Sequence, residues 1–549
     1  PKGANAVEMV EYTYQEKDYV YLYKPTAIGE NIIATGSDMM SGELLLRKGQ
    51  RITSREMGVL AAIGLSKVKV YKKPKVAIVS TGDELLPPGT PLGYGKVYDT
   101  NSSSLIGAVL ESGGDPIFLG IAPDDLDEMR KALKESLSQA DVVLTSGSTS
   151  VGAGDKLYAI IDELGPPGVI VHGLTIKPGK PTIIAIVNGK PIFGLPGYPT
   201  SALMIFFLLV SKVIRKMAGI KDHEERVSID AKIPFKVFSA KGRREFLPVH
   251  LIKDESMNFL AYPIQKDSGA ISSLSMADGF IEVKENQEFL DEGEIVKVNL
   301  FGSRLNLADL AIIGSHCIGI DVLISIIEKF DASIQTKVIN IGSIGGLYAI
   351  KRGEADVAGI HLFDEETGEY NEPFIEKYGL LDRALLIKGY DREQGFIVYK
   401  GNPKEIHWFD DLLRSDVSFV NRNRGSGTRV LTDFYLRNLS KEKGLSFERL
   451  FKSIKGYDFE AKSHSAIASA ILNRKADVGV GIKTVALRNG LDFVPITNEH
   501  YDFVIHKSRL NKKSVQVFLI ALKSREFKDE LKKVPGLVAT KETGEILTG

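Results

Sequence analysis

The stretch Val76-Ala-Ile-Val-Ser-Thr-Gly-Asp-Glu-Leu85 decides the fold of the first half of the chain, because a buried-strand pattern ends there in a glycine and acid turn. Apolar runs also border polar, glycine- or proline-rich turns at residues 97–103, 145–155, 177–181 and 194–201. Turns at the carboxyl ends of buried strands are where α/β proteins place ligand chemistry. These turns offer backbone amides, hydroxyls, lysines and acids, which together predict a site for a phosphorylated or oxyanionic ligand.

Composition limits the class of protein. The chain has 549 residues, too many for one core, so about two to four domains are expected. Its 70 basic and 70 acidic residues give a formal net charge of +0, which argues against a general nucleic-acid binder. The single cysteine, Cys317, excludes an internal disulfide framework and a cysteine-based zinc site, and we expect it to be a buried or spectator thiol.

We expect no contact with a membrane. The longest strongly apolar stretch, residues 203–213, is shorter than the about 20 residues that a bilayer span requires. No signal-peptide pattern is visible, so the cytoplasm is the expected compartment. Because the sequence starts at Pro1 rather than at Met, we expect it to be part of a longer product.

The changing period of the apolar residues predicts a multidomain α/β protein. Its expected parts are a β-rich N-terminal unit (residues 1–72), a three-layer α/β domain (73–217), a small β-barrel (218–304) and a two-lobed α/β domain (305–549). In the second part, strand and helix patterns alternate, which implies a mostly parallel sheet with helices on both faces. In the first part we expect a helix over 54–63 and a strand over 68–71.

The last part contains an internal repeat. Asp356-Val-Ala-Gly-Ile360 and Asp477-Val-Gly-Val-Gly481 each follow a helical pattern that ends in basic and small residues. We therefore predict two similar α/β lobes with a cleft between them.

A set of ordered motifs in residues 1–301 resembles one family. The motifs are Thr81-Gly-Asp-Glu-Leu85, Asp99-Thr-Asn-Ser102, Thr145-Ser-Gly147 with Ser150-Val-Gly152, Lys177-Pro-Gly-Lys-Pro181, Gly194-Leu-Pro-Gly197 with Pro199 and Ser201, Gly242-Arg-Arg-Glu-Phe246, and Ser268-Gly-Ala-Ile-Ser-Ser-Leu274. Together they resemble the molybdopterin molybdenumtransferases, the family of MoeA and the gephyrin E-domain. The resemblance implies that adenylylated molybdopterin is hydrolysed and that molybdate, or tungstate, is inserted with the help of Mg²⁺, giving cofactor and AMP.

The resemblance also implies an assembly and a partner. The expected assembly is a homodimer, with the site between the α/β domain of one subunit and the barrel of the other. The expected partner is the enzyme that makes adenylylated molybdopterin. No nucleic-acid partner is expected.

The resemblance assigns roles to individual residues. The expected catalytic residues are Glu84, Asp155, Lys177 and Lys180, and Glu84 and Asp155 are also the expected metal ligands. The expected substrate-binding residues are Asp99, Asn101, Ser146, Gly147, Ser148, Ser150, Gly152, Pro196, Pro199, Ser201, Arg243 and Ser272. The residue types suit these roles, because Mg²⁺ prefers hard oxygen ligands and a strand end before a helix can hold a phosphate on backbone amides.

Simpler structural roles stay open for several of these residues. Glu84 could be a cap or a surface carboxylate, and Asp155 could be a helix N-cap. Lys177 and Lys180 could be solvated turn lysines. Arg243 could belong to a surface ion pair, in which case Arg244 could take the ligand-binding role. Two departures from the family are visible: Ser148 stands where the family often has glycine, and the usual Met-Asp-Gly-Tyr-Ala motif is absent.

Residues 306–549 resemble the periplasmic-binding-protein-like domains. The residues that carry this resemblance are Ser315-His316, Gly342-Ser343, His361, Arg424-Gly-Ser-Gly-Thr-Arg429 and Ser463-His-Ser465. The expected ligand contacts are Ser315, Ser343, Ser426, Thr428, Arg429 and His464, because hydroxyls and amides at helix N-termini can hold a small anion. Molybdate, tungstate or a cofactor intermediate is the expected ligand. Alternatively, the serines are plain caps and the histidines and arginines are structural.

These observations predict a molybdenum cofactor transferase with an appended ligand-binding domain. The non-enzymatic alternative is a sensor or scaffold that keeps the fold without turnover. A nucleotide-dependent hydrolase, which would release AMP without molybdate, is a third possibility. The paired lysines favour the transferase, because a scaffold does not need two ammonium groups beside a carboxylate-lined turn.

Overall fold

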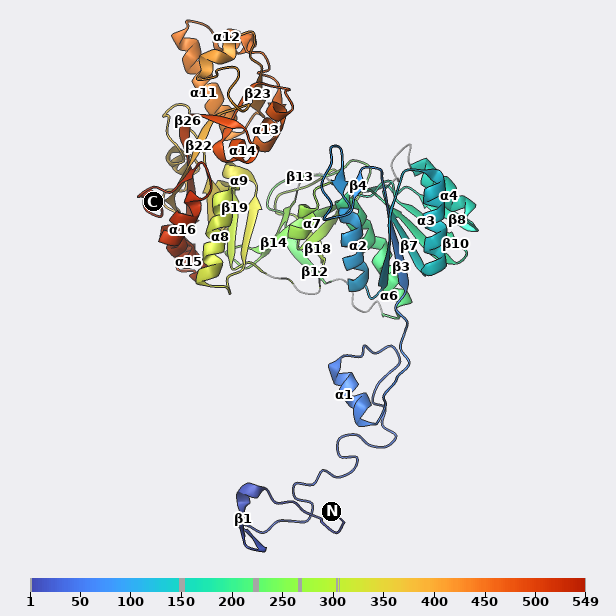
Figure 1. Ribbon diagram of the computed structural model, residues 1–549. Coiled ribbons are helices and arrows are strands. Elements are labelled where there is room, and N and C mark those ends of the chain that lie inside the picture. Colours follow the sequence, from blue (N-terminus) through green and yellow to red (C-terminus); the bar gives the residue numbers. More distant parts are fainter. Residues whose placement is uncertain are drawn as a thin grey trace. The chain divides into compact units, whose positions relative to one another are not determined.

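The computed structural model describes residues 2–147, 154–220, 227–264, 269–302, 305 and 307–548, with the backbone alone at residues 154 and 155. It divides into two compact units, one of Pro1–Leu174 and Gly179–Glu225, the other of Thr175–Pro178 and Arg226–Gly549. Each unit has its own sheets and its own cores. Figure 1 labels many of the elements of the two units.

The N-terminal part of the first unit has few regular elements: η1 (Val10–Tyr12), β1 (Thr13–Glu16), β2 (Tyr19–Leu22) and α1 (Ser54–Ala62). β1 and β2 pair antiparallel. The helix expected over 54–63 is confirmed, and Thr53 and Glu56 form a capping box at its start. The strand expected over 68–71 is wrong: Val70 and Tyr71 are exposed and lie in no strand. An extended segment becomes a strand only when a neighbouring strand pairs with its backbone, and no described strand pairs with this one.

A six-stranded sheet forms the centre of the first unit. Its order is β6-β3-β7-β11-β10-β8, in which β6, β3, β7 and β11 are parallel and β10 is antiparallel to both of its neighbours. The strands are β3 (Lys75–Thr81), β6 (Asp115–Ala122), β7 (Val142–Ser146), β8 (Pro167–His172), β10 (Ile183–Val187) and β11 (Lys190–Leu195). The short pair β4 (Leu85–Leu86) and β5 (Val97–Tyr98) follows the first strand end.

Helices cover both faces of this sheet, as expected (Figure 1). On one face α2 (Thr100–Glu111) contacts α5 (Pro199–Ile205) and α6 (Ser211–Met217), and the π-helical turn η2 (Phe206–Val210) joins the last two. On the other face lie α3 (Leu126–Gln139) and α4 (Gly154–Glu163). The second face is apolar because Met129 and Leu133 of α3 and Ile160 of α4 share a core with Ala77 and Val143 of the sheet. The predicted three-layer arrangement is therefore confirmed.

The second unit contains a closed barrel. Its order is β15-β12-β18-β16-β14, and a pairing between β14 and β15 closes it, while β9 (Ile176–Lys177) extends it beyond β14. The barrel strands are β12 (Ser228–Lys232), β14 (Arg244–Lys253), β15 (Phe259–Pro263), β16 (Gly279–Val283) and β18 (Ile295–Leu300). The other local elements are β13 (Val237–Phe238), which pairs with β17 (Phe289–Leu290), and α7 (Ser272–Met276).

Two lobes follow the barrel. The first lobe holds β19 (Leu310–Gly314), β20 (Thr336–Asn340) and β21 (Val357–Ile360), and the second holds β23 (Phe419–Arg422), β24 (Glu460–Ala461) and β25 (Val478–Ile482). Two long antiparallel strands, β22 (Ala384–Val398) and β26 (Asp492–His506), run through both lobes. In the first lobe β26 pairs with β21 over residues 502–505, and in the second lobe β22 pairs with β25 over residues 394–398.

The helices of the first lobe are α8 (Ile318–Phe330), α9 (Gly342–Lys351), α10 (Glu372–Lys377), α15 (Lys513–Lys523) and α16 (Arg525–Lys532). Those of the second lobe are η3 (Phe409–Leu413), α11 (Gly427–Glu442), α12 (Phe447–Ser453), α13 (His464–Leu472) and α14 (Lys483–Arg488). The remaining elements are η4 (Lys507–Arg509), β27 (Leu537–Val538) and β28 (Ile546–Thr548), and both strands pair with β22.

The internal repeat is confirmed as one strand in each lobe, β21 and β25. The aspartate that precedes each strand has the same role. Asp356 Oδ2 accepts a hydrogen bond from the backbone N–H of Ala311 (2.8 Å), and Asp477 Oδ2 accepts one from that of Ser418 (2.8 Å). The repeated carboxylate therefore joins the beginning of its strand to the neighbouring chain segment in both lobes.

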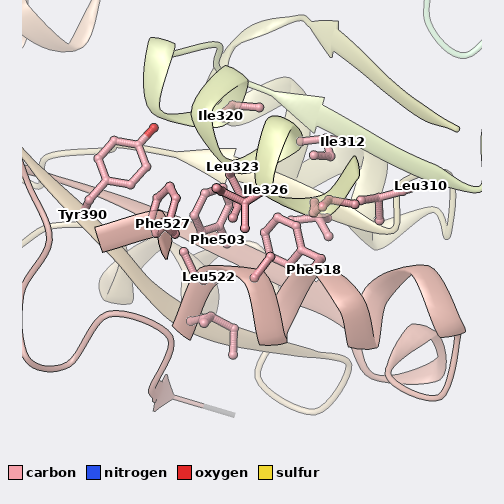
Figure 2. Packing of buried hydrophobic residues seen from close by; sticks show 14 of the residues in the cluster. Leu310, Ile312, Ile320, Leu323, Ile326, Tyr390, Phe503, Phe518, Leu522 and Phe527 are labelled. Carbon is pink, nitrogen blue, oxygen red and sulfur yellow. The ribbon is translucent and has the colours of Figure 1, made fainter. Parts of the chain in front are cut away.

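The core of the first lobe is aromatic and aliphatic. Figure 2 shows Phe503 and Phe518 packed against Leu323 and Ile326 of α8, with Tyr390 at one end of the cluster. Complete burial of such side chains contributes about 1.5–3 kcal/mol each. This core holds the C-terminal part of β26 in place. It therefore also positions the preceding part of β26, which lies toward the second lobe.

The barrel and the first lobe share a core. Leu260 and Tyr262 of β15 belong to the same buried cluster as Leu347 and Ile350 of α9. Around it, the Tyr262 hydroxyl donates to the Glu354 carboxylate, and burial together with this carboxylate raises the pKa of Tyr262. Lys337 of β20 forms a half-buried ion pair with Asp278 (2.6 Å). The barrel and the first lobe are therefore joined by a continuous apolar interface with polar contacts around it.

Candidate functional site

Strand ends bring the predicted turns of the first unit together. Thr81, Ser146 and Leu195 are the last residues of β3, β7 and β11, which are neighbours in the sheet. Asn101, in the first turn of α2, donates from Nδ2 to Ser146 Oγ (2.7 Å) and to the backbone carbonyl of Gly197 (2.8 Å). A single amide therefore links turns that lie 45 and 96 residues away from it in the sequence.

Several polar atoms beside this link are buried without a partner among the described residues. They are Ser80 Oγ, Asp99 Oδ2, Asn101 Oδ1 and Thr145 Oγ1. Ser80 and Thr145 lie on adjacent strands, where the register pairs Val79 with Thr145. A buried polar group left unpaired costs about 1–3 kcal/mol, so a group of them at strand ends is typical of a place that a polar ligand completes.

Gly147 is required by the geometry of this site. Its φ is 111°, and a Cβ atom on it would lie 2.2 Å from the Thr81 carbonyl oxygen. Its backbone N–H donates to the Leu195 carbonyl (3.3 Å). The absence of a side chain thus lets the turn after β7 pass directly over the end of β3.

We expect Gly147→Ala to lower the free energy of unfolding more than Gly120→Ala does. Gly120 also has a positive φ, 98°, but nothing lies within 4 Å of the added Cβ. Both variants carry the left-handed backbone penalty of about 1–2 kcal/mol, and Gly147→Ala adds an overlap cost of about 1–3 kcal/mol. Urea unfolding of the two variants measures the difference, and equal losses would show that the close approach to Thr81 is not required.

The other predicted residues of these turns have defined places. Asp99 caps α2, since its Oδ1 accepts from the Ser102 N–H (3.0 Å). Pro196 and Ser201 are buried, and Pro199 is the first residue of α5. Ser148, Ser150 and Gly152 lie outside the described residues, as does the side chain of Asp155, whose backbone is in the first turn of α4.

Glu84 is free to bind a cation. Its carboxylate is exposed and forms no hydrogen bond or ion pair with any residue that the structure describes, and it folds back over Gly82, where a Cβ atom would lie 2.8 Å from Oε2. Carboxylate oxygens are the donors that Mg²⁺ prefers, so Glu84 fits this ion by chemistry. The described residues hold no cluster of three or more His, Cys, Asp or Glu side chains suited to a metal, and Asp155 lies outside that search.

The two predicted lysines differ in their partners. In the second unit, Lys177 forms an ion pair with Glu245 (2.7 Å), whose side chain is 3% exposed and also accepts from Ser239 Oγ (2.9 Å). In the first unit, Lys180 is exposed, and its ammonium has no partner among the described side chains. Lys177 therefore neutralises a buried carboxylate, whereas the charge of Lys180 is uncommitted.

The neighbouring residues Arg243 and Arg244 also differ in their ion-pair partners. Arg244 pairs with Glu282 and Glu285 (both 3.1 Å), whereas the Arg243 guanidinium has no ion pair within the described part of the chain. Of the two, Arg243 is therefore the one with a charge available to a ligand. Ser272, at the start of α7, is exposed.

A polar cluster lies where β22 and β26 pass between the lobes; we call it the interlobe cluster. Ser315 Oγ lies 2.8 Å from His361 Nε2, His361 Nδ1 lies 2.7 Å from Glu499 Oε1, and the other Glu499 oxygen accepts from Arg392. A Cβ atom on Gly427 would lie 3.3 Å from His361 Nδ1, so the start of α11 adjoins the same imidazole. The cluster thus joins both lobes and both connecting strands.

The charges of Glu499 and Arg392 compensate each other. Burial opposes ionisation of Glu499, but the Arg392 guanidinium and His361 hold its pKa well below its ordinary value. His464 lies in the same region, and burial together with Arg422 and Arg392 lowers its pKa to about 3. Its Nδ1 atom is buried without a hydrogen-bond partner among the described residues.

The predicted ligand residues of the lobes fall into two groups. Ser426 caps α11 by accepting from the Arg429 N–H (3.2 Å), and Ser343 Oγ accepts from the His361 N–H (3.1 Å). Ser315, Thr428 and His464 belong to the interlobe cluster, in which Thr428 Oγ1 accepts from Gln394 Nε2 (3.3 Å). Gln394 Oε1 is buried and unpartnered among the described residues.

The predicted ligand contact Arg429 already has carboxylate partners, whereas Arg422, which was not predicted, has none in the described ranges. The Arg429 guanidinium is 4% exposed, pairs with Asp433 (2.9 Å) and Glu460 (3.2 Å), and stacks on Tyr457. Arg422, at the end of β23, has no carboxylate partner in the described ranges, and its Nε is buried without a hydrogen bond. Burial lowers the pKa of Arg422. The uncompensated cation of the cluster is therefore Arg422, which sequence reasoning missed.

Comparisons with known proteins agree with this architecture. Models of the MoeA N-terminal region (domains I and II), of a probable molybdopterin binding domain and of the MoeA C-terminal region (domain IV) match residues 1–64, 77–216 and 230–301. The molybdopterin molybdenumtransferase of Bacillus subtilis is 32% identical over 305 residues, which are 55% of this chain and 70% of that protein. That of Haemophilus influenzae is 32% identical over 310 residues, which are 56% of this chain and 76% of that protein.

The chain belongs to the molybdopterin molybdenumtransferase family. A solved structure of a MoeA protein from Pyrococcus horikosii is 43% identical, covers 55% of this chain and 74% of its own, and has a TM-score of 0.45. The PBP superfamily domain matches residues 327–523, so this molybdopterin molybdenumtransferase carries a periplasmic-binding-protein-like domain after its barrel.

The interlobe cluster of this transferase was only partly visible in the sequence. Glu499, Arg392 and Gln394 lie on long strands whose alternation gives no sign of their function. Ser315, His361, Thr428 and His464 lie in the motifs that carry the resemblance to periplasmic-binding-protein-like domains. Across the described ranges, no helix is both long and apolar enough to span a bilayer.

Proposed function

We propose that this molybdopterin molybdenumtransferase inserts molybdate, or tungstate, into adenylylated molybdopterin and releases AMP. The chain is an enzyme of molybdenum cofactor biosynthesis, as its family membership and its molybdopterin-binding and MoeA domains indicate. The observation that carries the finer proposal is the group of buried, unpartnered polar atoms at the ends of β3 and β7. This group offers hydrogen-bond donors and acceptors to a ligand. A pterin phosphate is rich in both kinds of group and would suit such a site.

Two kinds of contact support this reaction. Asp99, Asn101 and Ser146, with the backbone at Gly147 and the segment of Ser148, Ser150 and Gly152, would hold the molybdopterin. Pro196, Pro199 and Ser201 would shape and line the same pocket of the first unit. Ser272, in the second unit, is a further proposed substrate contact. Lys180 and Arg243 would each supply positive charge to the incoming oxyanion or to the phosphate, where fixed charges lower the energy of the transition state. Lys177 would contribute through its ion pair with Glu245.

Glu84 and Asp155 would hold a magnesium ion. The exposed and uncommitted Glu84 carboxylate supports this part of the proposal. When bound, the ion would supply positive charge to phosphate oxygens. The proposal also includes a homodimer, an adenylylating partner enzyme, a cytoplasmic location and domain boundaries near residues 72, 217 and 304.

We also propose that the interlobe cluster binds a small oxyanion such as molybdate or tungstate. Arg422 supports this because its charge is half-buried and has no carboxylate partner in the described part of the chain. An isolated buried charge is costly, and an anion would offset that cost. Ser315, Thr428, His464 and the N-terminus of α11 at Ser426 and Gly427 would add hydrogen-bond contacts.

A sensor or scaffold without turnover is the second candidate. The observation that favours it is the core shared by the barrel and the first lobe, because a continuous interface could pass a ligand signal from the lobes to the barrel. The uncommitted Lys180 and Glu84 favour the enzyme.

Release of AMP from adenylylated molybdopterin, with and without molybdate, tests the proposed reaction. We expect release to depend on molybdate and to be accompanied by cofactor formation. Release without molybdate would indicate a hydrolase. Binding of substrate without release would indicate a sensor or scaffold.

A further inference from the structure

The hydrogen bonds of Ser315, His361 and Glu499 take one direction when the His361 imidazole is neutral. The pKa of Glu499 is held low, although burial opposes this, by Arg392 and His361, so its carboxylate accepts only. His361 Nδ1 therefore carries the hydrogen of the 2.7 Å contact. In the neutral imidazole, Nε2 is then an acceptor, and the Ser315 hydroxyl donates to it over 2.8 Å. In this state, Ser315 Oγ offers a ligand lone pairs and no proton.

This arrangement does not suit a fully ionised oxyanion. Molybdate and tungstate offer acceptor oxygens only, and they would meet an acceptor at Ser315 Oγ. The mismatch disappears if His361 gains a proton, because both ring nitrogens then donate. Nε2–H donates to Ser315 Oγ, and the Ser315 hydroxyl turns its own hydrogen toward the anion.

The charges around His361 also favour uptake of a proton when a dianion binds. Arg392 and Glu499 compensate each other (2.9 Å), and the pKa of His464, about 3, leaves that ring neutral. Arg422 then supplies the remaining positive charge, so a bound dianion would leave one negative charge unbalanced in a half-buried site. A serine hydrolase triad has the same residue types, but its carboxylate is free to stabilise an imidazolium, whereas Arg392 neutralises Glu499 here.

We propose that His361, between Ser315 and Glu499, takes up one proton when the interlobe cluster binds a fully ionised oxyanion. This rests on the proposed anion-binding function of the lobes. The proton comes from solvent and stays on the imidazole, and no covalent bond other than the new N–H is made or broken. The hydrogen-bonded series Ser315, His361 and Glu499 therefore favours fully deprotonated ligands, and the affinity for them depends on pH.

The groups around His361 and its hydrogen-bond partner Glu499 come from each neighbouring element. They are Ser315 after β19, Ser343 on α9, Arg392 on β22, Gly427 on α11, His464 on α13, and Glu499 and Tyr501 on β26, with the rings of His361 and Tyr501 6.0 Å apart. Among these, His464 is the other residue that could accept the proton, so the experiment must separate the two histidines.

Titration calorimetry with sodium molybdate in buffers of different ionisation enthalpy tests the proposal on the full chain. The slope of the observed enthalpy against the buffer enthalpy counts the protons taken up, and we expect about one at neutral pH. Uptake of one proton also means that affinity falls by up to about tenfold per pH unit as the pH rises. These measurements need no variant.

Variants identify the acceptor. We expect His361→Gln to bring proton uptake to about zero, whereas the exposed control His316→Gln keeps it. Molybdate binding with no dependence on buffer would overturn the proposal and leave the anion-binding function standing. Proton uptake that persists in His361→Gln, or is lost only in His464→Gln, would also overturn it. No binding of molybdate or tungstate in any buffer would overturn both.

Discussion

Lys180→Ala is expected to lower molybdate-dependent AMP release by about 10²–10³-fold and to leave the fold intact. The large effect on activity follows from the loss of a fixed positive charge that is proposed to meet the oxyanion. The small effect on folding follows from the exposure of Lys180 and from the absence of any partner for its ammonium among the described residues. Surface substitutions of this kind change stability by about 0.5 kcal/mol or less.

The choice of Lys180 over Lys177 has a structural reason. Removal of Lys177 would leave the Glu245 carboxylate, which is 3% exposed, without its ion pair. A loss of activity could then come from a destabilised barrel. Lys131→Ala is the matched control, because Lys131 is an exposed lysine of the same unit at 3.8 Å from Glu128.

The measurement is AMP release and cofactor formation at saturating and at limiting molybdate. A change in the molybdate dependence, with unchanged urea unfolding, would support an oxyanion contact. Activity of Lys180→Ala equal to that of Lys131→Ala would refute the assignment of Lys180.

Arg422→Ala is expected to weaken molybdate binding by about 2–5 kcal/mol, which is about 30- to 4,000-fold. Arg422 has the one guanidinium of the interlobe cluster that lacks a carboxylate partner in the described ranges. Its NH1 donates to Asn423 Oδ1 and to the Ala461 carbonyl (both 2.9 Å). We expect its removal to cost about 1 kcal/mol or less in folding, because the lost hydrogen bonds are offset by the relief of a buried, uncompensated charge.

Arg424→Ala is the matched control for Arg422→Ala. Arg424 lies two positions further along the chain, but its side chain is 81% exposed and its nearest carboxylate, Glu460, is 3.9 Å away. Calorimetry of both variants separates a local site from general attraction by the basic segment. Equal losses of affinity in the two variants would show that no specific contact involves Arg422.

The sequence by itself determined the architecture of this protein. The spacing of apolar residues and the positions of glycines are local properties. The end of β3 could therefore be located from residues 76–85, and the ends of β7 and β11 from the turns at 145–155 and 194–201. The order of turns at their ends was sufficient to predict one shared site, and the repeated aspartates predicted two lobes. The prediction of a strand over 68–71 failed because a strand also needs a neighbouring strand to pair with, and a local sequence pattern carries no information about that neighbour.

Only the tertiary structure decided which charges are available to a ligand. Arg429 is neutralised by Glu460, 31 residues away, and Lys177 by Glu245, while Arg244 meets Glu285, 41 residues away. Arg422, Lys180 and Arg243 lie beside these residues in the sequence and are indistinguishable from them by type or spacing. Long-range packing determines which partners a charged side chain has. The hydrogen-bonded series Ser315, His361 and Glu499 forms only because β19, β21 and β26 lie side by side in the sheet.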